Sequence, residues 1–232
     1  MSIRSGIEQA LVRIENARDK ADRTDPVKLE LAVKTRTPEE CYEAAHVLAE
    51  LGRPILLGHN RVQEARNTVA AIRRVEGAEL HLIGPLQSNK INHALGCVDV
   101  IESVDCPVLV EKINARAKRE VPIFLEVNVS EEETKHGCRP SEVDALVDAA
   151  LGAEHLRLCG FMTVGLNSPV EKDVRAAYAQ LRSICERTEA ATGLRGLELS
   201  MGMSADLEWA IAEGASIVRI GTAVFGERRP RV

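Results

Sequence analysis

The sequence predicts one (β/α)8 barrel of the TIM type, preceded by an extra N-terminal helix. Eight short apolar runs alternate with eight helical stretches, a pattern typical of parallel strands joined by crossover helices. The length of 232 residues is close to that of such barrels. Neither a linker nor a low-complexity run interrupts the chain, so residues 1–232 are expected to form a single domain. A doubly wound open sheet is the structural alternative.

The individual elements follow from apolar runs, helical spacing and caps. The extra helix is predicted over 3–22, where apolar residues recur at helical spacing with charges between them. Thr37, followed by Pro38 and two glutamates, is a typical helix start. The predicted strands are 29–35, 54–58, 79–84, 98–103, 121–129, 156–164, 196–200 and 216–221. The helices that follow them are 38–51, 62–75, 91–95, 107–119, 140–151, 170–192, 205–213 and 222–225.

The composition excludes several classes of partner. With a formal net charge of -5 and only 3% aromatic residues, the chain has neither the basic surface nor the stacking side chains of a nucleic-acid binder. The N-terminus is polar where a signal peptide would be apolar, and no apolar run approaches the length of a membrane span. We therefore expect a cytoplasmic protein that binds neither nucleic acid nor membrane.

The cysteines and histidines give no sign of a metal site. The six cysteines are dispersed without a Cys-x-x-Cys pair, so free, mostly buried thiols are expected rather than disulfides or zinc ligands. The six histidines also lack the spacing of metal ligands. His81 lies in an apolar strand and is interpreted as a histidine of the core or the rim.

Lys34 is the first candidate functional residue. It falls near the end of the first predicted strand, and a barrel brings the carboxyl ends of its strands to the ligand-binding rim. Lysine is almost never fully buried without a partner. It is therefore either a side chain that reaches water from the end of a strand, or one held at the rim for chemistry.

The seventh and eighth strands supply a candidate phosphate site and a candidate arginine. Ser200 and the small residues after it, together with Gly221 and Thr222, would let backbone N–H groups and hydroxyls approach an anion, although ordinary turns have similar compositions. Arg219 lies two residues before Gly221 and so shares a strand face with the rim. A guanidinium is costly in a barrel core, so Arg219 is expected to meet a ligand acceptor or a carboxylate.

A lysine, a phosphate cup and an inward arginine on one rim fit a site for pyridoxal 5'-phosphate (PLP). Lys34 would form a Schiff base with the cofactor, the cup would hold its phosphate, and Arg219 would contact the pyridine nitrogen. An arginine at that nitrogen would keep it unprotonated and weaken PLP as an electron sink. A structural ion pair of Arg219 within the barrel is the alternative.

Five stretches of the sequence closely resemble the pyridoxal phosphate homeostasis protein family. They are 33–35 (VKT), 58–64 (GHNRVQE), 81–90 (HLIGPLQSNK), 199–204 (LSMGMS) and 218–226 (VRIGTAVFG). The resemblance spans nearly the whole chain and implies a fold similar to the N-terminal barrel of alanine racemase. It also implies that Lys34 carries PLP. The other residues that it places at or near the cofactor are Asn60, Met162, Ser200, Met203, Arg219, Gly221 and Thr222.

The resemblance is incomplete at three places. Family members often have glutamate and tyrosine where this chain has His59 and Arg61, so roles proposed for those side chains do not carry over. The spacing from Lys34 to Pro38 is one residue longer than the commoner pattern. Lys135 falls where some members have a second lysine proposed to handle PLP; a solvated loop lysine is the alternative.

Three functions compete on the sequence alone. The first is a PLP-binding protein that stores or delivers the cofactor without catalytic turnover and so serves vitamin B6 and amino-acid homeostasis, with PLP-dependent apoenzymes as candidate partners. The second is a weak amino-acid racemase, which would need a second base that alanine racemase takes from a separate domain. The third is a barrel enzyme that binds a phosphate ligand without PLP. A monomer is expected, because the racemase interface would be partly absent.

Overall fold

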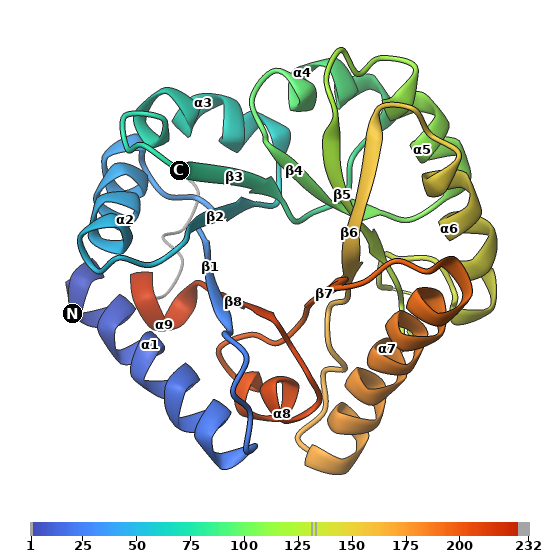
Figure 1. Cartoon of the computed structure of the whole chain (residues 1–232). Helices are drawn as coiled ribbons and strands as arrows, with labels where there is room; N and C mark the ends of the chain where they lie inside the picture. The colour runs from blue at the N-terminus through green and yellow to red at the C-terminus, as the bar shows by residue number, and fades with distance from the viewer. Residues whose placement is uncertain (1, 131, 133, 227–232) are drawn as a thin grey trace.

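A computed structural model describes residues 2–130, 132 and 134–226 as a closed barrel of parallel strands surrounded by helices (Figure 1). The strands follow one another around the barrel in chain order, and β1 pairs with β8 to close it. This confirms the predicted (β/α)8 fold. The doubly wound alternative is wrong, since an open sheet has two edge strands, whereas each of the eight strands here pairs with a neighbour on both sides.

The strands of the barrel are short and mostly buried. Their bounds are β1 Lys28–Ala32, β2 Ile55–His59, β3 Ala78–Leu82, β4 Val100–Val104, β5 Val121–Glu126, β6 Leu156–Met162, β7 Glu198–Ser200 and β8 Ile217–Ile220. The predicted strand 29–35 therefore ends three residues early. Thr35 has a φ of 61°, a left-handed conformation that cannot continue a strand, so Lys34 lies in the loop after β1.

Helices cover the outside of the barrel. The α-helices are α1 Ile3–Lys20, α2 Pro38–Glu50, α3 Val62–Ile72, α4 Ile91–Leu95, α5 Pro107–Asn114, α6 Val143–Leu151, α7 Glu171–Thr192, α8 Leu207–Ala212 and α9 Thr222–Phe225. Two short 3-10 helices, η1 Ser88–Lys90 and η2 Pro140–Glu142, precede α4 and α6. The predicted start at Thr37 is confirmed as a capping box in which Thr37 and Glu40 each accept from the other's backbone N–H. No helix in the described ranges is long and apolar enough to cross a membrane.

The extra helix α1 packs beside α8 and α9, near the rim where the last strand ends (Figure 1). Its buried face contains Ile7, Ala10 and Ile14, spaced as an amphipathic helix requires. Gly6 allows the closest approach, because a Cβ at this position would lie 2.8 Å from the backbone of Val224 in α9. The helix therefore supports the segment that follows β8.

Two apolar clusters stabilise the structure. The larger fills the layer between strands and helices. The smaller consists of strand residues alone, Val100, Phe124, Met162 and Ile217, and so belongs to the barrel interior. Above it the interior becomes polar, with Glu30, Glu102, Ser200 and Arg219 all buried. The polar part of the barrel thus lies next to the carboxyl ends of the strands. All six cysteines are free, and four are buried.

Gly160 offers a test of strand packing in the barrel. A Cβ at this position would lie 2.0 Å from the carbonyl oxygen of Glu198 in the neighbouring strand β7. We expect Gly160→Ala to lower the free energy of unfolding by about 1–3 kcal/mol, the usual cost of overpacking, in urea unfolding. Gly152→Ala is the control, because its nearest neighbour would be at 3.4 Å. Equal effects of the two substitutions would contradict this account of the β6–β7 contact.

Candidate functional site

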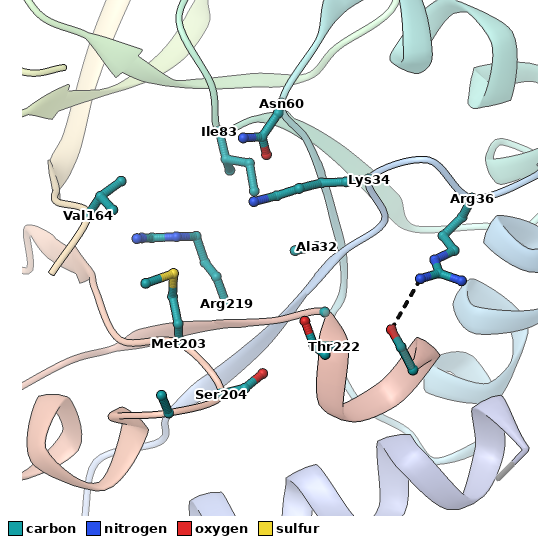
Figure 2. A pocket seen from close by; sticks show the side chains of 13 residues that line it. Ala32, Lys34, Arg36, Asn60, Ile83, Val164, Met203, Ser204, Arg219 and Thr222 are labelled. Atoms are coloured by element: carbon teal, nitrogen blue, oxygen red, sulfur yellow. Dashed lines mark hydrogen bonds between the residues drawn. The ribbon is translucent and has the colours of Figure 1, made fainter. Parts of the chain in front are cut away.

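A cavity of about 350 Å³ opens at the carboxyl ends of the strands (Figure 2). This volume lies within the range of small-ligand sites. The lining comes from the ends of β1 and β8 and from the loops after β1, β2, β3, β6, β7 and α9. The lining residues are Ala32, Lys34, Arg36, Asn60, Ile83, Val164, Met203, Ser204, Ala205, Arg219, Gly221, Thr222 and Gly226.

Lys34 reaches this cavity from the loop after β1, and Figure 2 shows its side chain pointing into it. The next residue, Thr35, holds the left-handed backbone conformation, which is uncommon for a residue other than glycine. The carboxylate of Glu64 accepts the Thr35 backbone N–H. His59, whose Nδ1 lies 3.7 Å from Glu64 Oε2, and this backbone hydrogen bond together hold the pKa of Glu64 below its usual value. Glu64 thus fixes the backbone beside Lys34.

The two residues that depart from the family pattern have different positions. His59 is fully buried at the end of β2, and its Nε2 lies 2.8 Å from Thr68 Oγ1. Arg61 is exposed and precedes α3. His59 therefore belongs to the support of the Lys34 loop, through Glu64, and Arg61 lies outside the set that lines the cavity around Lys34.

Arg219 enters the same cavity from β8 with its guanidinium anchored behind it. One Nη donates to the carbonyl and the hydroxyl of Ser200, at 2.6 and 2.7 Å, and the other donates to the Thr163 carbonyl at 2.6 Å. A guanidinium has five N–H donors, so two are left for a ligand in the cavity. Among the described side chains no carboxylate forms an ion pair with Arg219. Arg219 is therefore held by neutral acceptors and not by the structural ion pair that was the alternative interpretation.

The remaining predicted residues divide into two groups. Asn60, Met203, Gly221 and Thr222 line the cavity with Lys34 and Arg219. Asn60 Oδ1 is buried and finds no hydrogen-bond partner in the described part of the chain, so it is an acceptor available to a ligand. Gly221 has no room for a side chain, since a Cβ would lie 2.9 Å from the Ala32 carbonyl oxygen.

The structure places the other three predicted residues away from the cavity wall. Ser200 is fully buried behind Arg219, and Met162 lies in the small apolar cluster of the barrel interior. Lys135 donates from Nζ to Glu132 and to the carbonyl of Gly165, each at 2.7 Å, and its side chain is 15% exposed. It is therefore an ion-paired lysine rather than a solvated one, and it lies outside the cavity lining.

A cluster of buried ionisable side chains lies beneath Arg219, and the sequence analysis did not predict it. His81 Nδ1 lies 2.6 Å from Glu102 Oε1, and Ser200 Oγ lies 2.5 Å from Glu102 Oε2. Burial alone would lower the pKa of His81, but Glu102 and Glu79 outweigh it and raise the pKa to about 10. Burial and the charge of Glu102 raise the pKa of Glu30 above its usual value. His81 is therefore a charged core histidine.

The cluster also has the residue types and the spacing of a metal site. It consists of Glu30, His81 and Glu102. One ligand atom from each lies within 4.8 Å of the others. The histidine and one carboxylate already satisfy each other at hydrogen-bond distance. Sequence spacing missed this group because its members come from β1, β3 and β4. The signal was available in another form, since each is a titratable residue within a largely apolar strand.

The fold and the cavity define a barrel of the alanine racemase N-terminal class. The family model for the alanine racemase N-terminal domain matches residues 12–229. Pyridoxal phosphate homeostasis proteins of Aquifex aeolicus and Pseudomonas aeruginosa are 36% and 34% identical to this chain. The aligned regions cover 96% of the chain and 97% of the first relative, and 98% and 96% for the second. The chain therefore belongs to the pyridoxal phosphate homeostasis protein family.

Solved structures agree with this assignment. A structure described as an unknown protein from Bifidobacterium adolescentis is 38% identical, with a TM-score of 0.88 over 96% of this chain and 94% of that one. PipY of Synechococcus elongatus, solved with PLP bound, is 29% identical, with a TM-score of 0.77 over 92% of this chain and all of that one. Alanine racemase of Clostridium difficile, at 16% identity and a TM-score of 0.71, shares the fold; this chain covers 57% of it.

The buried carboxyl of Glu126 makes the stability of the protein depend on pH. Burial and the charge of Asp105 raise its pKa to about 7, so its protonated form favours folding. That stabilisation is complete below the unfolded pKa of about 4.5 and is lost as the pH rises through 7. Glu126→Gln does not ionise. Between pH 4.5 and pH 8, we expect the free energy of unfolding of the wild type, measured with urea, to fall by about 3 kcal/mol relative to that of Glu126→Gln.

The matched control for this titration is Glu154→Gln, which removes the same charge from an exposed position. The pH dependence that this control shows is subtracted from that of Glu126→Gln. A difference between Glu126→Gln and the wild type that stays constant with pH would show that Glu126 is ionised normally in the folded protein.

Proposed function

We propose that this protein holds PLP covalently on Lys34 in the cavity at the carboxyl ends of the strands, and does so without catalytic turnover. The observation that carries the proposal is the placement of the Lys34 amine and the unused Arg219 donors around one cavity. Membership of the family, and the PLP bound in PipY, support PLP as the ligand. The protein would serve the intracellular balance of PLP and of amino acids.

The residues around the cavity match the chemical groups of PLP. The Lys34 amine would condense with the aldehyde, forming a C=N bond and releasing water. Backbone N–H groups near Gly221 and the hydroxyls of Ser204 and Thr222 offer donors to a phosphate. The free donors of Arg219 suit a ring nitrogen, and Asn60 and Met203 complete the wall. We assign Ser200 an indirect role through Arg219, and Met162 a role in the floor beneath.

The absence of turnover is supported by the side chains that face the cavity. Within the described lining there is no carboxylate, histidine, tyrosine or cysteine to act as a second acid or base. Arginine is always protonated and only donates, so at the ring nitrogen Arg219 would keep that nitrogen unprotonated. PLP would then be a poor electron sink.

The alternative is a PLP-dependent enzyme with weak amino-acid racemase activity, which the alanine racemase fold favours. It requires exchange of the α-proton of an added amino acid with solvent. Loss of α-deuterium from labelled D- or L-alanine in the presence of the PLP-loaded protein would favour this alternative.

We further propose that the protein acts in the cytoplasm as a single-domain monomer and passes PLP to PLP-dependent apoenzymes. The net charge of -5 gives no attraction to nucleic acid or to anionic lipid. A small-molecule carrier needs a partner only at the moment of transfer, which is compatible with a monomer.

The assignment of Lys34 is tested by the visible spectrum with PLP. We expect wild-type protein to develop an imine band that borohydride fixes to a peptide containing Lys34. Lys34→Ala should lose the band completely, because no other lysine lines this cavity in the described structure. Lys135→Ala is the matched control and should retain it, since Lys135 pairs with Glu132 outside the lining.

Two results would overturn the assignment. One is a wild-type protein that shows no imine band with excess PLP. The other is a Lys34→Ala variant that keeps the band while Lys135→Ala loses it, which would move the PLP lysine to the loop after β5.

A further inference from the structure

We propose that Glu102 is a positioning residue for Arg219 and acts through the hydroxyl of Ser200. The inference deepens the proposed function and rests on it, because Arg219 is the side chain assigned to the ring nitrogen of PLP. Neither Glu102 nor Ser200 lines the cavity. Both lie in the layer directly beneath Arg219, where they are fully buried.

The Ser200 hydroxyl has a single proton to donate. Arg219 donates to Ser200 Oγ at 2.7 Å and is unable to accept, so this hydroxyl must be an acceptor toward the guanidinium. Its own proton is then free for another acceptor. Glu102 Oε2 lies 2.5 Å away on the other side, a distance typical of a hydroxyl that donates to a carboxylate. The hydrogen bonds therefore run in one direction, from Arg219 to Ser200 to Glu102.

Glu102 also meets His81. Its other oxygen, Oε1, lies 2.6 Å from His81 Nδ1. With the pKa of His81 raised to about 10, its Nδ1–H donates to Oε1, so that Glu102 accepts at both oxygens, as an ionised carboxylate can. The charged His81 supplies the counter-ion, and its hydrogen bond holds the pKa of Glu102 below the usual value despite burial. Glu102 is thus a buried anion whose two oxygens are both occupied.

These contacts span the barrel. His81 and Glu102 belong to β3 and β4, whereas Ser200 and Arg219 belong to β7 and β8. The four residues are each at most 5% exposed, and buried hydrogen bonds are stronger than those in water. The series of contacts therefore connects opposite sides of the ring. It restricts the direction in which the remaining donors of Arg219 face the cavity.

Glu126 provides a matched comparison. It is a third buried glutamate of the barrel interior, and Arg219 lies close enough to lower its pKa by charge. No hydrogen bond joins Glu126 to Ser200 or Arg219 in the part of the chain that the structure describes. At pH 8.5, above the raised pKa of Glu126 of about 7, Glu126→Gln removes a negative charge as Glu102→Gln does and leaves the Ser200 contact in place, so the comparison is made at that pH.

The experiment begins with the protein free of PLP. Proton–nitrogen NMR spectra of the arginine side chains would identify the Arg219 Nη signals by their loss in Arg219→Lys. We expect separate Nη signals in the wild type and in Glu126→Gln, because the guanidinium is held. In Glu102→Gln one amide is unable to accept from both Ser200 and His81, so these signals should merge through rotation.

The second measurement is the dissociation constant for PLP. Loss of one charge-assisted hydrogen bond predicts about tenfold weaker binding by Glu102→Gln and Ser200→Ala. Borohydride should still fix PLP on Lys34 in both variants, and Glu126→Gln should bind within about twofold of the wild type. Ser200→Ala removes a single oxygen and carries the test if Glu102→Gln fails to fold.

The outcomes separate this inference from the proposed function. Separate Arg219 signals in both Glu102→Gln and Ser200→Ala, with PLP affinity unchanged, would overturn the positioning role. Equal losses in Glu126→Gln and Glu102→Gln would also overturn it, in favour of a simple effect of charge. A wild type that forms no imine would overturn the proposed function, while the PLP-free spectra would still decide whether Glu102 holds Arg219.

Discussion

The burial of the Arg219 guanidinium is the constraint on which the site depends. An arginine that is 5% exposed in a barrel interior needs acceptors for its donors, and Ser200 and Thr163 supply them from β7 and from the end of β6. Because these acceptors are neutral, the guanidinium meets the buried carboxyl groups of Glu30, Glu102 and Glu126 only through longer-range charge interactions. The polar layer beneath the cavity is therefore a consequence of placing one cation on β8.

The other side of the cavity depends on a backbone constraint. β1 stops at Ala32, and the left-handed Thr35 turns the chain so that Lys34 faces the cavity from a loop. In a regular strand, the direction of a side chain is set by period-two alternation. Lys34 lies two residues beyond the end of β1, so the direction of its side chain is set by the loop instead. Glu64 and His59 offset the conformational cost at Thr35 through the backbone hydrogen bond and the buried contact beneath it. The cavity thus has one rigid wall on β8 and one held loop after β1.

Much of the fold could be predicted from the sequence because each apolar run corresponds to one strand of the barrel. Lys34, Arg219, Gly221 and Thr222 were also found, since strand ends meet at one rim in this architecture. The roles of Ser200 and Glu64 were not, because they depend on contacts between residues far apart along the chain. Glu30 and Glu102 were not singled out either, because the partners that they meet are decided by the closure of the barrel.

The central claim is that one cavity brings PLP between Lys34 and Arg219. The most direct measurement is a crystal structure of the protein grown with PLP. The account predicts continuous density from Lys34 Nζ to the cofactor and a hydrogen bond from Arg219 to the ring nitrogen. Cofactor density attached to Lys135, or a ring turned so that its phosphate rather than its nitrogen meets Arg219, would contradict it.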